Sequence, residues 1–156
     1  MDIDGVLNPF LSFDLAEKGF VHVVEGWHSA SLDLVNHKLW LHDLYDRADL
    51  VWGSSWLQDS NSLIKHYELP SDLDYVSLNF KGNDPDVTWK LSSVRSFASR
   101  RSSDVIPVVW IDDEIKQDAL DWAKARGNTM IVVTDPSVGW TKEQYQAILK
   151  FIADHG

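Results

Sequence analysis

Two carboxylates near the N-terminus have a spacing that could support phosphoryl transfer. They belong to the segment Asp2-Ile3-Asp4-Gly5. Because side chains two apart on an extended segment point to one face, Asp2 and Asp4 can address one reacting atom while Ile3 turns into the core. One carboxylate could act as a nucleophile and the other as general acid and then base. The motif is short, and a solvated strand end followed by a turn is the simpler alternative.

A second acidic pair, Asp112 and Asp113, directly follows the apolar run Val105 to Ile111. Adjacent carboxylates at a strand end repel each other, and Mg²⁺, which binds carboxylates, carbonyls and waters, would relieve that repulsion. The alternative is that these acids open the next helix, where the helix dipole favours negative charge. That alternative explains Glu114 and extends to Asp113, but it explains Asp112 less well.

Lys90 and Ser54 occupy two further positions of chemical interest. Lys90 stands at a predicted helix start, where the helix dipole disfavours a cation, so a phosphate or a carboxylate cluster would account for it. Ser54 follows the apolar segment Leu50 to Trp52 and can donate its hydroxyl or backbone N–H to an anion. For Ser54 taken singly, a helix N-cap or a turn is the more common role.

Alternating strand and helix patterns must position these side chains. The predicted strands are Met1 to Ile3, Phe20 to Val24, Leu50 to Trp52, Tyr75 to Phe80, Val105 to Ile111 and Met130 to Val133. The last two are continuous apolar runs, which is typical of strands covered on both faces by helices. Tyr75 to Phe80 instead alternates between apolar and polar residues, so we expect it to be less completely covered.

Four helices are predicted between these strands. Three are Leu32 to Tyr45, a helix starting at or just after Lys90, and Asp113 to Arg126, which Gly127 would end. The fourth starts at the capping box Thr141-x-x-Gln144 and carries an apolar stripe. We therefore expect one domain over residues 1–156, a three-layer α/β sandwich around a mostly parallel, Rossmann-type sheet. Its ligand site should lie at the carboxyl ends of the strands.

Composition limits the classes of chemistry and of partner. The chain has 156 residues, no cysteine and a formal net charge of −10. Thiolate zinc sites, redox CxxC motifs and cysteine nucleophiles are excluded, and a long nucleic-acid duplex is a poor candidate partner. The longest apolar run has seven residues, against roughly 18 for a membrane span, and the N-terminus has no signal-peptide pattern. We expect a cytoplasmic protein; its oligomeric state stays open.

Taken in chain order, four motifs resemble those of the haloacid dehalogenase (HAD) superfamily over nearly the whole chain. They are Asp2-Ile3-Asp4-Gly5, Ser54, Lys90 and Asp112-Asp113. The second aspartate of the first motif is similar to that of the phosphatase branch, because dehalogenases lack it. The resemblance implies a Mg²⁺-dependent phosphomonoester hydrolase that acts through an aspartyl phosphate.

The resemblance also implies a role for each residue. Asp2 would be the nucleophile and Asp4 the general acid and base. Mg²⁺ would be held by the Asp2 side chain, the Asp4 backbone carbonyl and Asp112, with help from Asp113. The phosphoryl oxygens would be held by Lys90 and Ser54, with Ser55 as the rival for the serine role because the strand end can be read one residue later.

The chain departs from the family pattern in two ways. Only Met1 precedes Asp2, where family members carry several apolar residues, so the central strand is either trimmed or unusually short. The 50 residues from Asp4 to Ser54 and the 36 from Ser54 to Lys90 leave no room for a cap domain. We therefore expect a capless member with an open site, for a large substrate or one covered by a neighbour's surface.

The substrate is left open between a nucleotide, a nucleic-acid end and another phosphorylated molecule. Trp27, Trp56 and Trp89 lie near the motifs and could stack on a base or sugar, although packing in the core is the more common role for each. Two other functions stay in consideration. A receiver-like phosphoacceptor domain is disfavoured by the chain order of the motifs, and a catalytically inactive HAD-like binding module is disfavoured by the intact motif set.

Overall fold

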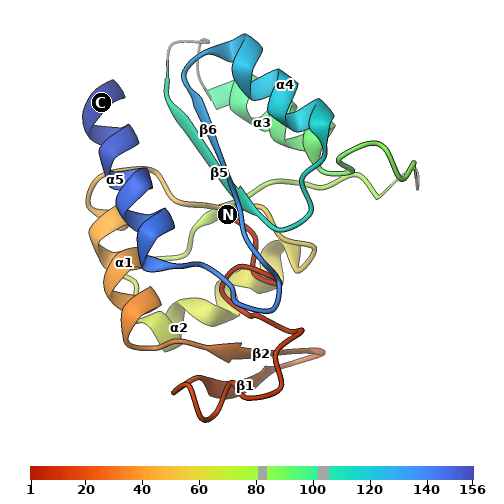
Figure 1. Ribbon diagram of the computed structural model, residues 1–156. Helices are drawn as coiled ribbons and strands as arrows, with labels where there is room; N and C mark the ends of the chain where they lie inside the picture. Colours follow the sequence, from red (N-terminus) through yellow and green to blue (C-terminus); the bar gives the residue numbers. More distant parts are fainter. Residues whose placement is uncertain (81–83, 102–105) are drawn as a thin grey trace.

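The computed structural model describes residues 1–80, 84–101 and 106–156 (Figure 1). Its strands are β1 (Val21–Glu25), β2 (His28–Leu32), β3 (Val51–Trp52), β4 (Asp74–Tyr75), β5 (Val108–Asp112) and β6 (Thr129–Val133). Its helices are α1 (Asn36–Tyr45), the 3₁₀ helix η1 (Leu57–Leu63), α2 (Ile64–Tyr67), α3 (Leu91–Arg101), α4 (Gln117–Arg126) and α5 (Lys142–His155). In this part of the chain, no helix is long and apolar enough to cross a membrane.

The described strands pair two by two. β1 and β2 form an antiparallel hairpin, whereas β3–β4 and β5–β6 are parallel pairs. Helices lie on both sides of the β5–β6 pair, α3 and α4 on one side and α5 on the other (Figure 1). The predicted α/β class and parallel pairing are therefore present, but a three-layer sandwich around one continuous sheet is not confirmed.

The N-terminal residues link the two parallel pairs. The Met1 ammonium donates a hydrogen bond to the Val51 carbonyl at 2.9 Å, and the Gly53 N–H donates to the Met1 carbonyl at 2.7 Å. On the other side, the Asp2 N–H donates to the Ile111 carbonyl at 3.0 Å. The predicted strand Met1 to Ile3 is not formed as a strand, because the ladder ends after these few bonds, yet the segment lies between β3 and β5.

An apolar cavity of about 400 Å³ lies beside Met1. Residues of β3 and β5 line it, including Val51 and Val109, together with Phe97 from α3 and Ile148 from α5. The Met1 ammonium is buried here, and burial lowers its pKa from 8.0 to about 6.

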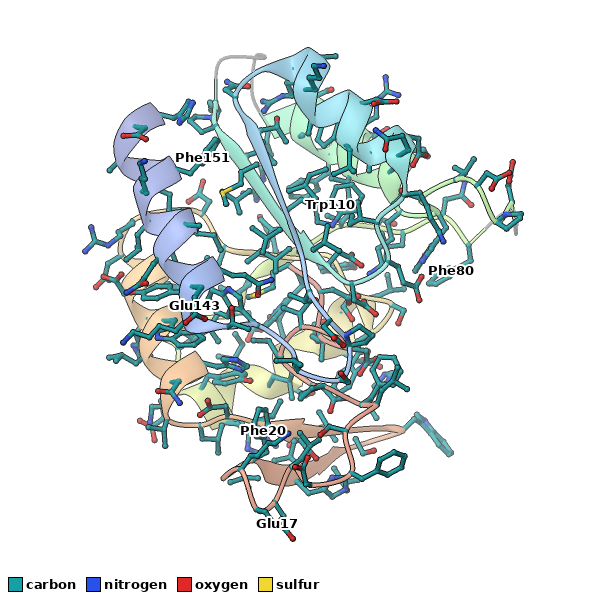
Figure 2. The ribbon with its side chains drawn as sticks, in the orientation of Figure 1. Glu17, Phe20, Phe80, Trp110, Glu143 and Phe151 are labelled. Atoms are coloured by element: carbon teal, nitrogen blue, oxygen red, sulfur yellow. The ribbon has the colours of Figure 1, made fainter. Side chains whose placement is uncertain are left out.

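Side chains of β5 pack in opposite directions. Trp110 is buried toward α3 and α4, with its ring 6.3 Å from that of Trp122 in a T-shaped arrangement. Ile111 belongs instead to the core cluster that contains Ile148 of α5. Figure 2 shows Trp110 and the α5 residue Phe151 on opposite sides of the strand pair. Burial on both faces explains why this segment reads as a continuous apolar run.

The predicted C-terminal helix is confirmed together with its capping box. Thr141 Oγ1 accepts a hydrogen bond from the Gln144 N–H, and Gln144 Oε1 accepts one from the Thr141 N–H. The helix predicted from Lys90 is confirmed as α3, which begins at Leu91. These elements are predictable because their signals are local in sequence.

The helix predicted from Leu32 begins four residues later, at Asn36. Asp33 Oδ1 accepts hydrogen bonds from the Val35 and Asn36 N–H groups, both at 2.9 Å, so the chain turns there before it becomes helical. The preceding residues form β2, which the sequence did not predict, because its pattern His-Ser-Ala-Ser-Leu contains only two apolar positions. β1 also runs one residue later than the predicted Phe20 to Val24.

Three further boundaries differ from prediction. The strand predicted at Tyr75 to Phe80 is limited to Asp74–Tyr75, although Val76 and Leu78 are buried as the alternation indicates. The strand predicted from Val105 starts at Val108 in the described residues, and Val105 itself lies outside them. The helix predicted from Asp113 starts at Gln117.

Candidate active site

A tight turn positions the first motif. The Ile3 carbonyl accepts hydrogen bonds from the N–H groups of Val6, Leu7 and Asn8, at 2.9 to 3.2 Å. Gly5 has a φ of +78°, and a β-carbon added there would lie 2.3 Å from Asp113 Cγ. Gly5 is therefore required both by its backbone conformation and by the close approach of a carboxyl group.

Asp2 is buried with both carboxylate oxygens hydrogen-bonded. Its Oδ1 accepts from the Ile3 N–H at 2.8 Å, and its Oδ2 accepts from Lys90 Nζ at 2.5 Å. Burial raises the pKa of Asp2, the negative charge of Asp112 adds to that rise, and Lys90 opposes it. The carboxylate is thus desolvated but held by two donors.

Lys90 bridges two carboxylates at the N-terminal end of α3. Its ammonium also donates to Asp112 Oδ2 at 2.8 Å, and its side chain is 3% exposed. Burial by itself would lower the pKa of Lys90, but the charges of Asp2 and Asp112 outweigh burial and raise it. The expectation that a carboxylate cluster accounts for a cation at this helix start agrees with this geometry.

Asp112 is fully buried at the end of β5. Its Oδ1 accepts from the Glu114 N–H at 3.0 Å, and its Oδ2 also accepts from Trp110 Nε1 at 3.2 Å. Asp113 is half-buried, and burial together with Asp112 raises its pKa to about 6. The helix-opening explanation for Asp113 and Glu114 is wrong, because α4 begins only at Gln117.

Three of the predicted carboxylates form a group that could hold a metal ion. In the described residues, Asp2, Asp112 and Asp113 each offer an oxygen, and these oxygens lie within 4.8 Å of one another. These three carboxylates have one buried cation, Lys90, between them, and it donates to Asp2 and Asp112. Hard carboxylate oxygens that outnumber the nearby cation suit Mg²⁺, so the residues fit the predicted ion.

The Asp4 carboxylate is held away from that group. Its Oδ1 accepts from Asn8 Nδ2 at 2.7 Å, and its Oδ2 accepts from Trp56 Nε1 at 2.9 Å. Neither contact is predicted from the sequence. Asn8 is four residues from Asp4 and could have been suggested by a local turn, whereas the pairing with Trp56 joins residues 52 positions apart.

The two candidate serines differ in burial. Ser54 is 1% exposed, and its Oγ accepts from the Trp56 N–H at 3.3 Å, so it caps the turn that leads to η1. Ser55 is exposed. The Gly53 N–H donates to the Met1 carbonyl, so the residues that come next, Ser54 and Asp2, are neighbours in the two adjacent segments. The local turn role expected for Ser54 is present.

The three tryptophans near the motifs have three different environments. Trp56 is buried, as core packing predicts, and its ring stacks on that of His28 with centroids 4.4 Å apart. Trp27 is fully exposed, so the expectation of core packing is wrong for it. Trp89 is partly exposed and stacks on the exposed Phe80 at 5.5 Å, and Lys90 Nζ lies 5.3 Å from its ring centroid.

Thr88 and Asp118 support Lys90 and were not predicted. Thr88 Oγ1 donates to Asp118 Oδ1 at 2.6 Å and accepts from the Lys116 N–H at 2.8 Å. Both carboxylate oxygens of Asp118 also lie 3.1 Å from the Thr88 backbone nitrogen, which donates to them. This network connects the segment before α3 to the start of α4. It therefore fixes the backbone position from which the Lys90 side chain extends.

Comparison with protein families gives one match over most of the chain. The family is described as "HAD domain in Swiss Army Knife RNA repair proteins", and its sequence model matches residues 1–145. Comparison with curated proteins and with solved structures gives no match.

Proposed function

The chain belongs to the family of HAD domains in Swiss Army Knife RNA repair proteins, and on this basis we propose that it is a Mg²⁺-dependent phosphomonoester hydrolase. Membership confirms the resemblance to the HAD superfamily, whose members generally hydrolyse phosphate esters. One observation supports a catalytic role for this chain most strongly. Asp2, Lys90 and Asp112, from distant parts of the sequence, form one buried hydrogen-bonded cluster.

In the first half of the proposed reaction, Asp2 attacks the phosphorus of the substrate. A bond forms between a carboxylate oxygen and phosphorus while the ester P–O bond breaks. Asp4 delivers a proton to the leaving oxygen, so the product is an alcohol. The hydrogen bond from the Ile3 N–H to Asp2 holds the nucleophile in place for this attack.

In the second half, the aspartyl phosphate is hydrolysed. Asp4, now a carboxylate, takes a proton from a water whose oxygen bonds to phosphorus, and the bond between phosphorus and Asp2 breaks. Inorganic phosphate leaves and Asp2 is a carboxylate again. We assign Lys90 and Ser54 to the phosphoryl oxygens, Lys90 because its buried ammonium is in direct contact with Asp2.

Mg²⁺ would be held by the side chains of Asp2, Asp112 and Asp113 and by the backbone carbonyl of Asp4. When bound, the ion supplies positive charge that offsets repulsion between an anionic nucleophile and an anionic phosphate. The close grouping of the three carboxylates supports this assignment.

For the substrate, we propose a terminal phosphate on a single RNA strand. The family description points to RNA repair, and the chain between Asp4 and Ser54 holds only the β1–β2 hairpin, α1 and the two-residue strand β3 as regular elements. A strand end can reach a site without a cap domain. The stacked pair Phe80 and Trp89, next to Lys90, offers an aromatic surface for a base.

The decisive experiment measures hydrolysis of an aryl phosphate with Mg²⁺, with EDTA, and in Asp2→Asn. We expect Mg²⁺-dependent turnover that disappears in EDTA and in the variant, while circular dichroism shows an unchanged fold. The matched control is Asp154→Asn, which alters an exposed carboxylate on α5 and should keep full activity. Wild-type protein and Asp2→Asn turning over equally would exclude the aspartyl phosphate.

The remaining alternative is a catalytically inactive binding module of the same fold. That function predicts no turnover on 5′- or 3′-phosphorylated RNA, on nucleotides or on aryl phosphates, even when Mg²⁺ binds. Asp4→Asn provides a second distinction. If Asp4 is the general acid and base, its loss in this variant should lower turnover by roughly 10²–10⁴-fold.

A further inference from the structure

Strand β2 contacts both residues that hold the Asp4 carboxylate. Asn8 Oδ1 accepts a hydrogen bond from the Ser31 N–H at 2.9 Å, which leaves the Asn8 amide N–H₂ directed at Asp4. The Trp56 indole, which donates to the other Asp4 oxygen, lies against the ring of His28, with the planes 14° apart. Ser31 and His28 both belong to β2, so two separate contact chains run from this strand to one carboxylate.

The His28 ring is itself held in place on η1. Its Nε2 lies 3.3 Å from Asp59 Oδ2, and the side chain is 28% exposed. Trp56, beneath it, is 5% exposed. The imidazole therefore covers one face of the indole and restricts the ring that bonds to Asp4.

The hairpin is anchored by a few buried side chains and by the ion pairs of Glu25 with Lys65 and His66 of α2. Its buried residues are Val23, Ala30 and Leu32, and most of the remaining residues of β1 and β2 are exposed or half-exposed. Its polar contacts through Ser31 and His28 reach Asp4. Anchoring the hairpin to the core does not require that the contacts of Ser31 and of His28 both lead to the Asp4 carboxylate.

We propose that β2 is a positioning element for Asp4, acting through Trp56 and Asn8, and that His28 and Trp56 are positioning residues for proton delivery. This inference rests on the proposed function, in which Asp4 protonates the leaving oxygen. Small displacements of a reacting group can slow a reaction about a hundredfold, so fixing one carboxylate rotamer has a large effect on rate. The effect falls on the two proton transfers of Asp4, to the leaving oxygen in the first half and from water in the second half, and not on Asp2.

The test compares two phosphate esters in the full chain. p-Nitrophenolate leaves without a proton, whereas the alkoxide of an alkyl phosphate needs one. Because kcat/KM covers only the first half of the reaction, it excludes the later step in which Asp4 activates water and isolates protonation of the leaving oxygen. In Trp56→Phe we expect kcat/KM for the alkyl ester to fall at least about tenfold more than kcat/KM for p-nitrophenyl phosphate. His28→Ala should shift the same ratio less, and His28→Phe, which keeps an aromatic ring over the indole, should restore it.

Trp27→Phe is the matched control, because Trp27 is next to His28 in the hairpin turn but fully exposed. It should leave the ratio of the two kcat/KM values unchanged. Equal losses of kcat/KM on the two esters in Trp56→Phe and in His28→Ala would overturn the positioning role and leave the phosphatase assignment intact. Absence of turnover by the wild-type protein on both esters would overturn the proposed function, and the positioning role with it.

A second measurement does not depend on turnover. The indole N–H resonance of Trp56, identified by its loss in Trp56→Phe, should shift and exchange faster in Asp4→Ala, because its acceptor is removed. His28→Ala should broaden or shift the same resonance. An unchanged Trp56 resonance in Asp4→Ala would overturn the proposed contact chain, even if the kinetic ratio changed.

Discussion

The ammonium of Lys90 lies 2.8 Å from Asp112 Oδ2, and the same ammonium contacts Asp2. All three side chains are at most 8% exposed. One buried cation thus pairs two buried anions, and the half-buried Asp113 adds further negative charge beside them. In the proposed function, Lys90 therefore links stability, metal affinity and catalysis.

Lys90→Met should destabilise the protein in the absence of metal. Removing one partner from a buried ionic cluster leaves unpaired charges and costs about 3–5 kcal/mol. The same change makes the carboxylate cluster more negative, so Mg²⁺ should raise the melting temperature of Lys90→Met more than that of wild type, although turnover is lost. Thermal unfolding with and without Mg²⁺ measures both effects.

Lys150→Met is the control for that experiment, because Lys150 is an exposed residue of α5. It should match wild type in both conditions. A Mg²⁺-induced shift of the same size in Lys90→Met and wild type would show that Lys90 and the ion do not share the carboxylate cluster.

Gly5→Ala should weaken Mg²⁺ binding and stability together. The added methyl group would meet the Asp113 carboxyl, and the positive φ strains any residue with a β-carbon. We expect the free energy of unfolding to fall by about 1–3 kcal/mol and the Mg²⁺ dissociation constant to rise. Denaturant unfolding and calorimetric titration with Mg²⁺ measure the two quantities.

Gly127→Ala separates backbone strain from displacement of Asp113. Gly127 has a φ of +83°, and in the described residues nothing lies within 4 Å of an added β-carbon. This variant should lose comparable stability but keep wild-type Mg²⁺ affinity. If both alanine variants bound Mg²⁺ like wild type, Asp113 would have no part in the metal site.

Trp89→Ala should raise KM for a phosphorylated RNA end while leaving KM for an aryl phosphate nearly unchanged. Loss of one base-stacking surface costs about 1–3 kcal/mol, which is roughly a 5- to 150-fold change. Trp89→Phe keeps a stacking surface but loses the hydrogen bond from Trp89 Nε1 to Glu114, and should stay close to wild type. A rise in KM for both substrates in Trp89→Ala would indicate a general disturbance of Lys90 rather than base stacking.

Local signals predicted much of the regular structure. The capping box of α5 and the apolar run of β5 act through neighbouring residues; α5 begins where predicted, and β5 forms within the predicted run from Val108 onward and extends to Asp112. β2 was missed because its pairing with β1, and not its own pattern, makes it a strand. The helix expected from Leu32 begins later because Asp33 turns the chain before Asn36.

The sequence by itself determined which residues could carry the chemistry. The types and chain order of Asp2, Asp4, Lys90 and Asp112 indicated the HAD superfamily, and the absence of cysteine limited the site to oxygen and nitrogen groups. Such information resides in residue identity and order, so it needs no knowledge of contacts.

Only the tertiary structure decided how those residues pair. Lys90 contacts Asp2 and Asp112, and Trp56 contacts Asp4, across separations of 22 to 88 residues. No local pattern encodes such partners, because they depend on where the N-terminal segment lies between β3 and β5 and where the hairpin places His28. Burial, which raises the pKa values of Asp2 and Asp113, likewise arises only when these distant segments come together.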